Sequence, residues 1–249
     1  MKHLISLFLL AATPFFASAA SFNTGPTADA FVTTGPGGAL SGNNYGGGGG
    51  LSLSAAGLPQ GELQSVLQFN LGGAVSSFNS TFGVGQWSIQ SVTLQLSTAP
   101  PNNAIFNTPA AGAFGISWMQ NDAWMEGNGT PASPGANGIT FSSLHSLFIG
   151  AGDENLGTFS FNGATAGRFT YALGLTLGFT ADVVAGDNLS LRLFAADSSV
   201  SAVFNSRTFG TVDNRPLLTI VAVPEPGTIA LGGAGLLMFG SWRWMRRKK

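Results

Sequence analysis

The pattern that decides the fold is clearest from Phe169 to Phe179, which reads FTYALGLTLGF. Every odd position in this stretch is Phe, Tyr or Leu, and every even position is Thr, Ala or Gly. Because side chains of a strand point alternately to its two faces, the pattern predicts one long strand with one apolar face. The same period of two recurs at residues 92–96, 114–118 and 189–193. Each of these patterns predicts a strand that covers a core on one side.

Shorter strand-like segments fill most of the remaining chain between Gly-, Pro-, Asn- and Ser-rich turns. They are residues 29–33, 51–54, 64–70, 158–161, 202–204 and 217–221. About ten short strands joined by such turns are typical of two antiparallel sheets packed face to face. We therefore expect residues 20–222 to form an all-β, antiparallel jelly-roll β-sandwich. No segment sustains a period of 3.6, so we expect no helix longer than about two turns.

The composition agrees with a β-rich domain. The 249 residues are 44% hydrophobic, which excludes a wholly disordered chain, yet only 8% are charged, against about 25% in ordinary soluble domains. Cysteine is absent, which excludes disulfides, thiolate metal sites and cysteine nucleophiles. Residues 20–223 hold four arginines and ten acidic residues, a net charge of −6. Without a basic stripe, nucleic-acid binding is not expected.

The N-terminus has the form of a secretory signal peptide, residues 1–19. Lys2 and His3 precede the apolar run from Leu4 to Leu10, and Ala17-Ser18-Ala19 forms a small-x-small cleavage site. The expected partners are the Sec translocon and signal peptidase, which would cut after Ala19 or Ala20. The alternative is a buried N-terminal helix or a membrane anchor, for which the run is short.

The C-terminus, residues 223–249, combines a short motif, an apolar helix and a basic end. Pro224-Glu225-Pro226 precedes a predicted transmembrane helix at about residues 227–244. The apolar part from Gly227 to Trp242 is sixteen residues and would span about 24 Å as a helix, slightly less than the roughly 30 Å hydrocarbon layer. The basic terminus, residues 243–249, places the domain outside the cytoplasm. Its charges are Arg243, Arg246, Arg247, Lys248 and Lys249.

This tail resembles the PEP-CTERM sorting signal of Gram-negative bacteria that produce exopolysaccharide. The resemblance implies export through the inner membrane, recognition by an exosortase, cutting near the Pro-Glu-Pro motif, and transfer to the cell surface or extracellular matrix. A permanent single-pass anchor is the alternative, and it gives the domain the same outward orientation.

The domain itself is similar to DNRLRE-type extracellular domains, which resemble carbohydrate-binding jelly rolls. The matching segments occur in order as Asp29-Ala30-Phe31-Val32, Asn44-Tyr45-Gly46, residues 65–71, residues 89–96, Trp124-Met125-Glu126, Phe204-Asn205-Ser206-Arg207 and residues 215–220. Two features depart from the family pattern: Thr208 stands where Glu often follows Ser-Arg, and a second Trp after the Trp-x-Glu segment is missing. The fold transfers from this resemblance better than the function does.

Candidate ligand-binding residues lie around Trp124. An exposed ring beside Asp122, Glu126 and Asn128 would suit a sugar, whose CH face stacks on the ring while its hydroxyls reach the polar groups. The alternative is that Trp124 packs under its loop, as Trp118 is expected to pack in the core. Ser206-Arg207 is expected to anchor a loop through hydrogen bonds rather than to hold a ligand.

Metal binding and catalysis have weaker support in the sequence. Asp29, Asp122, Glu126, Asp153 and Glu154 could supply oxygen ligands to a structural calcium ion, although no EF-hand spacing exists. The mature chain has one histidine, His145, expected in a loop or in packing, and neither a Gly-x-Ser-x-Gly elbow nor a His-Glu-x-x-His pair. Asp122 and Glu126 could still serve as the two carboxylates of a glycosidase.

We therefore expect a non-catalytic surface or matrix module, without a cofactor, that binds extracellular polysaccharide or serves as a structural component. The alternatives are a polysaccharide hydrolase or lyase, and a surface adhesin with a non-sugar ligand. The chain would be anchored transiently in the inner membrane before it reaches the surface or matrix.

Overall fold

The structure is a computed structural model that describes residues 18–101, 105 and 109–225. The predicted signal peptide lies outside these residues except for its last two positions. Pro226, the predicted transmembrane helix and the basic terminus also lie outside them. Within the described ranges, no helix is both long and apolar enough to cross a membrane.

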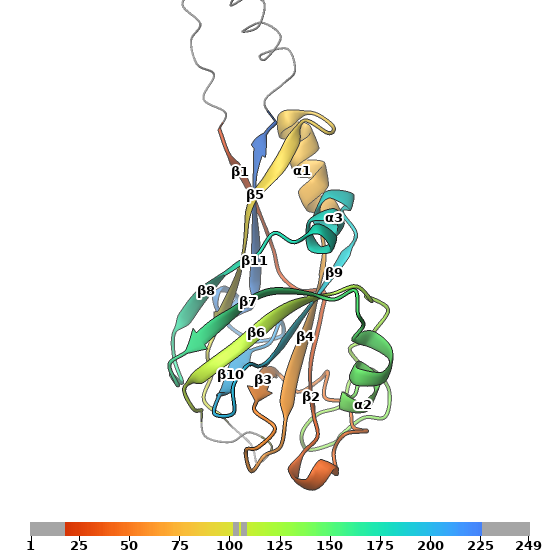
Figure 1. The fold of residues 1–249 in the computed structure, drawn as a ribbon, viewed down its shortest axis with the longest axis vertical. Helices are drawn as coiled ribbons and strands as arrows, with labels where there is room; N and C mark the ends of the chain where they lie inside the picture. Colours follow the sequence, from red (N-terminus) through yellow and green to blue (C-terminus); the bar gives the residue numbers. More distant parts are fainter. Residues whose placement is uncertain (1–17, 102–104, 106–108, 226–249) are drawn as a thin grey trace, which may run out of the picture.

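Eleven strands and several short helices make up the described chain (Figure 1). In chain order they are β1 (Ala20–Thr24), β2 (Ala28–Thr33), η1 (Pro36–Gly38), β3 (Gly50–Ser54), β4 (Leu63–Asn70), α1 (Gly72–Phe82), β5 (Trp87–Ser97), β6 (Gly112–Met119), α2 (Phe141–Ser143), η2 (Leu144–Phe148), β7 (Glu154–Phe161), β8 (Arg168–Leu173), α3 (Leu177–Ala185), β9 (Asn188–Ala195), β10 (Ser201–Asn205), η3 (Val212–Asn214) and β11 (Leu217–Pro224).

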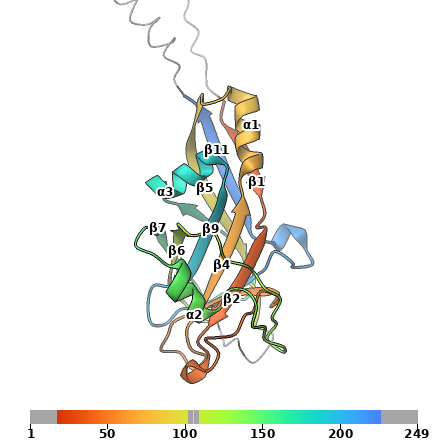
Figure 2. The same cartoon turned by 90° about the vertical axis from the view of Figure 1, so that its right-hand side faces the viewer.

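The strands form two antiparallel sheets, which confirms the predicted all-β class. The four-stranded sheet has the order β1-β11-β5-β8. The seven-stranded sheet has the order β10-β3-β4-β9-β6-β7, with β2 added along β4. Figure 2 shows the long strands of both sheets running along the molecule. The finer jelly-roll assignment stays a prediction.

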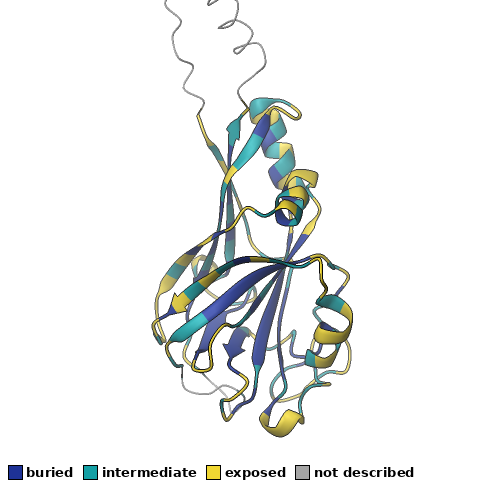
Figure 3. Ribbon diagram, viewed as in Figure 1, coloured by how far each residue is buried: buried dark blue, intermediate teal, exposed yellow. Residues whose placement is uncertain are grey.

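The main core lies between the sheets. It is built from the apolar faces of strands of both sheets, including Leu94 of β5, Ile116 of β6, Leu191 of β9 and Ile220 of β11. In β5 and β11 buried and partly exposed residues alternate, as the period of two predicts. Figure 3 shows the strands of the larger sheet as the most continuously buried part of the molecule.

The larger sheet is also covered on its outer face, by residues 120–149, which we call the roof. Trp124, Ile139 and Leu144 of the roof pack with Val32 and Val66 of β2 and β4 in a second apolar cluster. Thr140 caps α2 by accepting a hydrogen bond from the backbone N–H of Ser143. The strands under the roof are buried on both faces, so β2, β4 and β6 show largely continuous rather than alternating burial.

The predicted strand 169–179 is wrong in its second half. The strand β8 ends at Leu173, and α3 begins at Leu177, whose side chain is 90% exposed. Phe179 and Val183, four residues apart, are the buried pair of this helix, and Gly186 (φ 76°) ends it in the left-handed conformation. The alternation of apolar and small residues therefore continues past the end of β8 into α3, where it no longer reflects a strand.

The expected absence of longer helices is also wrong. Eleven residues form α1, about three turns, and nine form α3. Ala74 and Phe78 of α1 enter the main core at a spacing of four, but Gly, Ser and Asn occupy most other positions. A weak amphipathic pattern with poor helix formers gave little signal in the sequence.

Both ends of the described domain leave from one end of the molecule (Figure 1). Ala20 of β1 lies opposite Ala222 of β11, so the predicted signal-peptide cut falls beside the start of the sorting tail. Strand β1 was missed in the sequence, and β11 extends to Pro224, two residues beyond the predicted domain boundary.

Candidate functional site: a polar clamp and a nearby cavity

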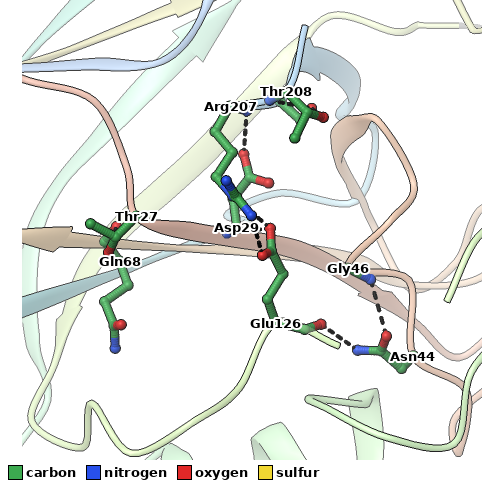
Figure 4. A network of polar contacts seen from close by, with 9 residues as sticks. Thr27, Asp29, Asn44, Gly46, Gln68, Glu126, Arg207 and Thr208 are labelled. Atoms are coloured by element: carbon green, nitrogen blue, oxygen red, sulfur yellow. Dashed lines mark hydrogen bonds and ion pairs between the residues drawn. The ribbon is translucent and has the colours of Figure 1, made fainter. Parts of the chain in front are cut away.

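The motif residues Asp29, Asn44, Glu126 and Arg207 come together at one place, although they are far apart in the sequence (Figure 4). We call these four residues the polar clamp. They come from β2, from the turn before β3, from the roof, and from the segment after β10. The clamp thus joins segments of the chain that carry the resemblance to extracellular jelly rolls.

An ion pair forms the centre of the clamp. Nε of Arg207 donates to Oε1 of Glu126 (2.8 Å) and Nη2 donates to Oε2 (2.5 Å), a bidentate arrangement. Oε1 also accepts the backbone N–H of Asp29 (3.1 Å), on the edge of β2 that does not face β4. The side chains of Arg207 and Glu126 are 34% and 18% exposed. The pair connects the roof to the segment after β10, and confirms that Arg207 anchors a loop.

Asp29 is the buried carboxyl of the clamp, with 2% of its surface exposed. Its Oδ2 accepts the backbone N–H of Arg207 (2.6 Å). Burial raises the pKa of Asp29 to about 7; the hydrogen bond from Arg207 opposes this shift, and the nearby charge of Glu126 adds to it. The folded protein therefore favours the neutral form of Asp29 over much of the acidic range.

Asn44, fully buried, uses its amide at both ends. Its Nδ2 donates to the backbone carbonyls of Glu126 and Ile139 (both 2.7 Å), and its Oδ1 accepts the N–H of Gly46 (3.2 Å) and Gly129 (3.1 Å). Gly46 lies so close to the roof that a Cβ there would be 2.0 Å from the carbonyl oxygen of Glu126. The Asn-Tyr-Gly turn therefore fastens the roof rather than forming a ligand loop.

Trp124 does not offer an exposed stacking platform, so this part of the predicted sugar site is wrong. The side chain is 4% exposed and belongs to the cluster under the roof, and its Nε1 donates to Oγ of Ser190 (2.8 Å). Ser190 is fully buried in β9. The packing alternative holds for this tryptophan. Trp118 is in the main core as expected, with Nε1 donating to Asp182.

The other predicted ligand residues do not surround Trp124 as a binding site would require. Glu126 is engaged by Arg207, and Asn128 is exposed on the roof. Burial raises the pKa of Asp122 to about 6, against hydrogen bonding from Ser190. Oδ1 of Asp122 is buried with no hydrogen-bond partner in the described structure.

The five acidic residues considered for calcium lie at separate places. Asp29 and Glu126 are in the clamp, Asp122 is near Ser190, and Asp153 accepts the N–H groups of residues 120 and 150. Glu154 accepts hydrogen bonds from Thr176 (2.5 Å) and from the first turn of α3, which hold its pKa below the ordinary value. Across the described ranges, no three His, Asp or Glu side chains gather as a metal site needs.

His145 has a packing role, as expected. Its ring stacks on Phe141 with centroids 4.2 Å apart, and Nδ1 lies 3.0 Å from the carbonyl oxygen of the same residue. No serine or carboxylate is hydrogen-bonded to this ring in the described structure.

A cavity that the sequence did not indicate lies beside the segment after β10, which also carries Arg207 of the polar clamp. Its volume is about 720 Å³, and it lies where β5 ends, β8 begins and the segment after β10 passes. Its lining includes Ser97, Arg168, Asn205, Phe209 and Asn214. The cavity forms where Ser97 of β5 pairs with Arg168 of β8. This pairing depends on strand register, which the sequence pattern did not give.

The sorting motif begins inside the fold. Pro224 is the last residue of β11, opposite Trp87, and the N–H of Glu225 donates to the carbonyl of Gln86 (2.9 Å). The first two motif residues therefore have ordered partners on β5 and the turn before it.

Comparison with known proteins identifies the tail. Residues 222–248 match the PEP-CTERM protein-sorting motif, which indicates an exported protein sorted by exosortase. No curated protein matches the chain. Two structures of turnip yellow mosaic virus are 10% identical over 91% of both chains, with TM-scores of 0.22 and 0.23. A structure of Desmodium yellow mottle tymovirus is 9% identical over 91% of this chain and 94% of that one, with a TM-score of 0.22. TM-scores this low do not establish a shared fold.

Proposed function

We propose that this exported protein is a non-catalytic module, acting without a cofactor, that binds polysaccharide at the cell surface or in the extracellular matrix. The observation that carries the proposal is the pairing of β1 with β11, next to the sorting motif. The start of β1 and the end of β11 lie at one end of the elongated domain (Figure 1), so a chain held in the membrane by its tail would extend the rest of the domain away from it. This arrangement suits display.

The fate of the two candidate catalytic carboxylates supports a binding role over hydrolysis. A glycosidase needs two carboxyl groups that face one substrate-sized space. Glu126 is instead paired with Arg207 across the edge of β2, while Asp122 lies beside Ser190 of β9. Carboxylates engaged in this way fasten the roof and are poor candidates for an acid–base pair.

Delivery is tested in the native host with and without its exosortase. The intact chain should stay at the inner membrane at its uncut size when the exosortase is missing, and deletion of residues 224–249 should release the domain. An unchanged size and location without the exosortase would mean that the tail is only an anchor.

Binding is tested by retention of the purified protein on extracellular polysaccharide from the host. A shallow site should give dissociation constants of roughly micromolar to millimolar, and display in many copies would strengthen retention. New reducing ends or unsaturated sugars during incubation, lost on D122N or E126Q substitution, would replace this proposal with an enzyme.

A further inference from the structure

We propose that the cavity between β5, β8 and the segment after β10 binds a carboxylate-bearing polysaccharide, with Arg168 as its charged contact. This inference rests on the proposed function and names its site and its class of ligand. The cavity, about 720 Å³, is large enough for a few sugar units.

The charge of the cavity is the first argument. The domain has a net charge of −6, yet no Asp or Glu lines this cavity and Arg168 does. The guanidinium is exposed; Nη2 donates to Oδ1 of Asn214 (3.1 Å), and no carboxylate pairs with it in the described ranges. One oriented Arg with free N–H groups fits a carboxylate, which it can bind through two parallel hydrogen bonds.

A buried polar atom without a partner is the second, independent argument. Ser97, which lines the cavity and lies opposite Arg168 in the β5–β8 register, is 4% exposed, and its Oγ has no hydrogen-bond partner among the described residues. Buried hydroxyls are normally satisfied, so an unsatisfied one beside a cavity indicates a group that is missing there. A sugar hydroxyl could donate to this atom or accept from it.

The remaining lining suits a sugar more than an inorganic anion. Asn205 is buried and its Nδ2 donates to the carbonyl of Asn214 (3.2 Å), which fixes two amides at the cavity wall. Phe209 adds a partly buried aromatic ring for the CH face of a sugar. Its carbonyl accepts a hydrogen bond from Nε of Arg215 (2.6 Å), which holds the segment in place.

The surroundings favour a polymer over a single sugar. Next to Ser97 and Arg168, the outer face of the small sheet continues with Gln95 opposite Thr170 and Thr93 opposite Ala172. Thr170 and Ala172 are exposed, Thr93 and Gln95 are partly exposed, and all four side chains are uncharged. A chain seated in the cavity can extend over hydroxyl and amide groups.

The test measures binding of polygalacturonate to the full chain, purified in a mild detergent, by calorimetry. We expect methyl-esterified polygalacturonate and the R168Q variant each to weaken binding at least about tenfold, the loss of one charge-assisted contact. The affinity of R168K should lie between those of wild type and R168Q, because lysine keeps the positive charge but cannot form two parallel hydrogen bonds to a carboxylate. T158A, an exposed change on β7 of the other sheet, should bind like wild type.

The esterified polymer tests the carboxylate without any change to the protein, and thermal unfolding checks that the variants fold. Equal binding of the free and esterified polymers, wild-type affinity of R168Q, or no binding of polygalacturonate by the wild type would overturn the inference. Retention of neutral dextran, unaffected by R168Q, would overturn this site and leave the proposed function standing. Failure to retain any polysaccharide would overturn both.

Discussion

The outer faces of the two sheets differ in what covers them. The seven-stranded sheet carries the roof, with an apolar cluster beneath it and the polar clamp at its margin. The four-stranded sheet carries no second apolar cluster on its outer face in the described structure, and that face presents partly exposed polar and apolar side chains, among them Thr93, Gln95, Thr219 and Val221. The outer face of the seven-stranded sheet contributes to stability by packing under the roof. The outer face of the four-stranded sheet is partly exposed and could contact a ligand.

The difference changes how the motif residues are interpreted. Trp124, Glu126, Asn44 and Arg207 stood out in the sequence because they lie in short segments similar to those of DNRLRE-type domains, a similarity that stays a prediction. In the structure all four hold the roof or connect it to the segment after β10. A motif can therefore mark an assembly point of the fold, while the surface that we propose for binding consists of Arg168 and of Ser, Thr and Asn residues that belong to no motif.

The largest expected effect comes from removing the anchor of the roof. W124A should destabilise the domain by about 3–5 kcal/mol, because a buried aromatic side chain leaves a cavity. W124F should cost less, since it keeps one aromatic ring and loses the hydrogen bond to Ser190 and only part of the buried volume. Urea unfolding of residues 20–225, secreted without the tail, measures both. A loss below about 1 kcal/mol for W124A would show that the roof is not part of the cooperative core.

A somewhat smaller effect is expected at the turn that fastens the roof. N44A should cost about 3 kcal/mol, since it leaves buried carbonyl and N–H groups without partners. N44D keeps the accepting oxygen but cannot donate to the carbonyls of Glu126 and Ile139, so it should not restore stability. Hydrogen exchange should show faster opening of residues 126–139 in both variants. Wild-type stability of N44D would contradict the assigned donor role.

Much of this contrast could be predicted from the sequence, and the rest depended on information that local patterns lack. Alternation located β5, β6 and β9, because each has one apolar face and a distinct second face. It misassigned residues 175–179, where Leu177 continues the pattern but is exposed at the start of a helix. Burial of Trp124 depends on which segment crosses the outer face of the sheet, and the cavity at Arg168 depends on strand register. Neither is encoded in a short window of sequence.

The third prediction concerns the pH dependence of stability, which we expect to come from a buried carboxyl group in the polar clamp, at the margin of the roof. The pKa of Asp29 is raised from 3.8 to about 7, so the folded state binds this proton more tightly than the unfolded state. Stability from this group is fully present below about pH 4 and is lost as pH rises to 7, at about 1.4 kcal/mol per pH unit.

The matched variants D29N and D122N test whether this loss of stability with rising pH comes from Asp29. D29N should remove the fall in stability between pH 6 and 7. D122N should leave it, because the pKa of Asp122, about 6, places its own loss mostly below pH 6. Urea unfolding midpoints measured from pH 4 to 8 give both slopes. An unchanged slope in D29N between pH 6 and 7 would contradict a neutral buried Asp29.

The smallest effect is expected on the uncovered face. Thr93 and Thr219 are direct neighbours on β5 and β11, both partly exposed. Valine has nearly the same shape and keeps the β-branched side chain, so T93V and T219V remove two hydroxyls without disturbing the strands. If nothing covers this face, each variant should unfold within about 0.5 kcal/mol of wild type. A loss above about 1 kcal/mol that grows with protein concentration would mean that a second copy covers the face in solution. In that case the contrast between the two sheets would belong to the isolated chain and not to the assembled protein.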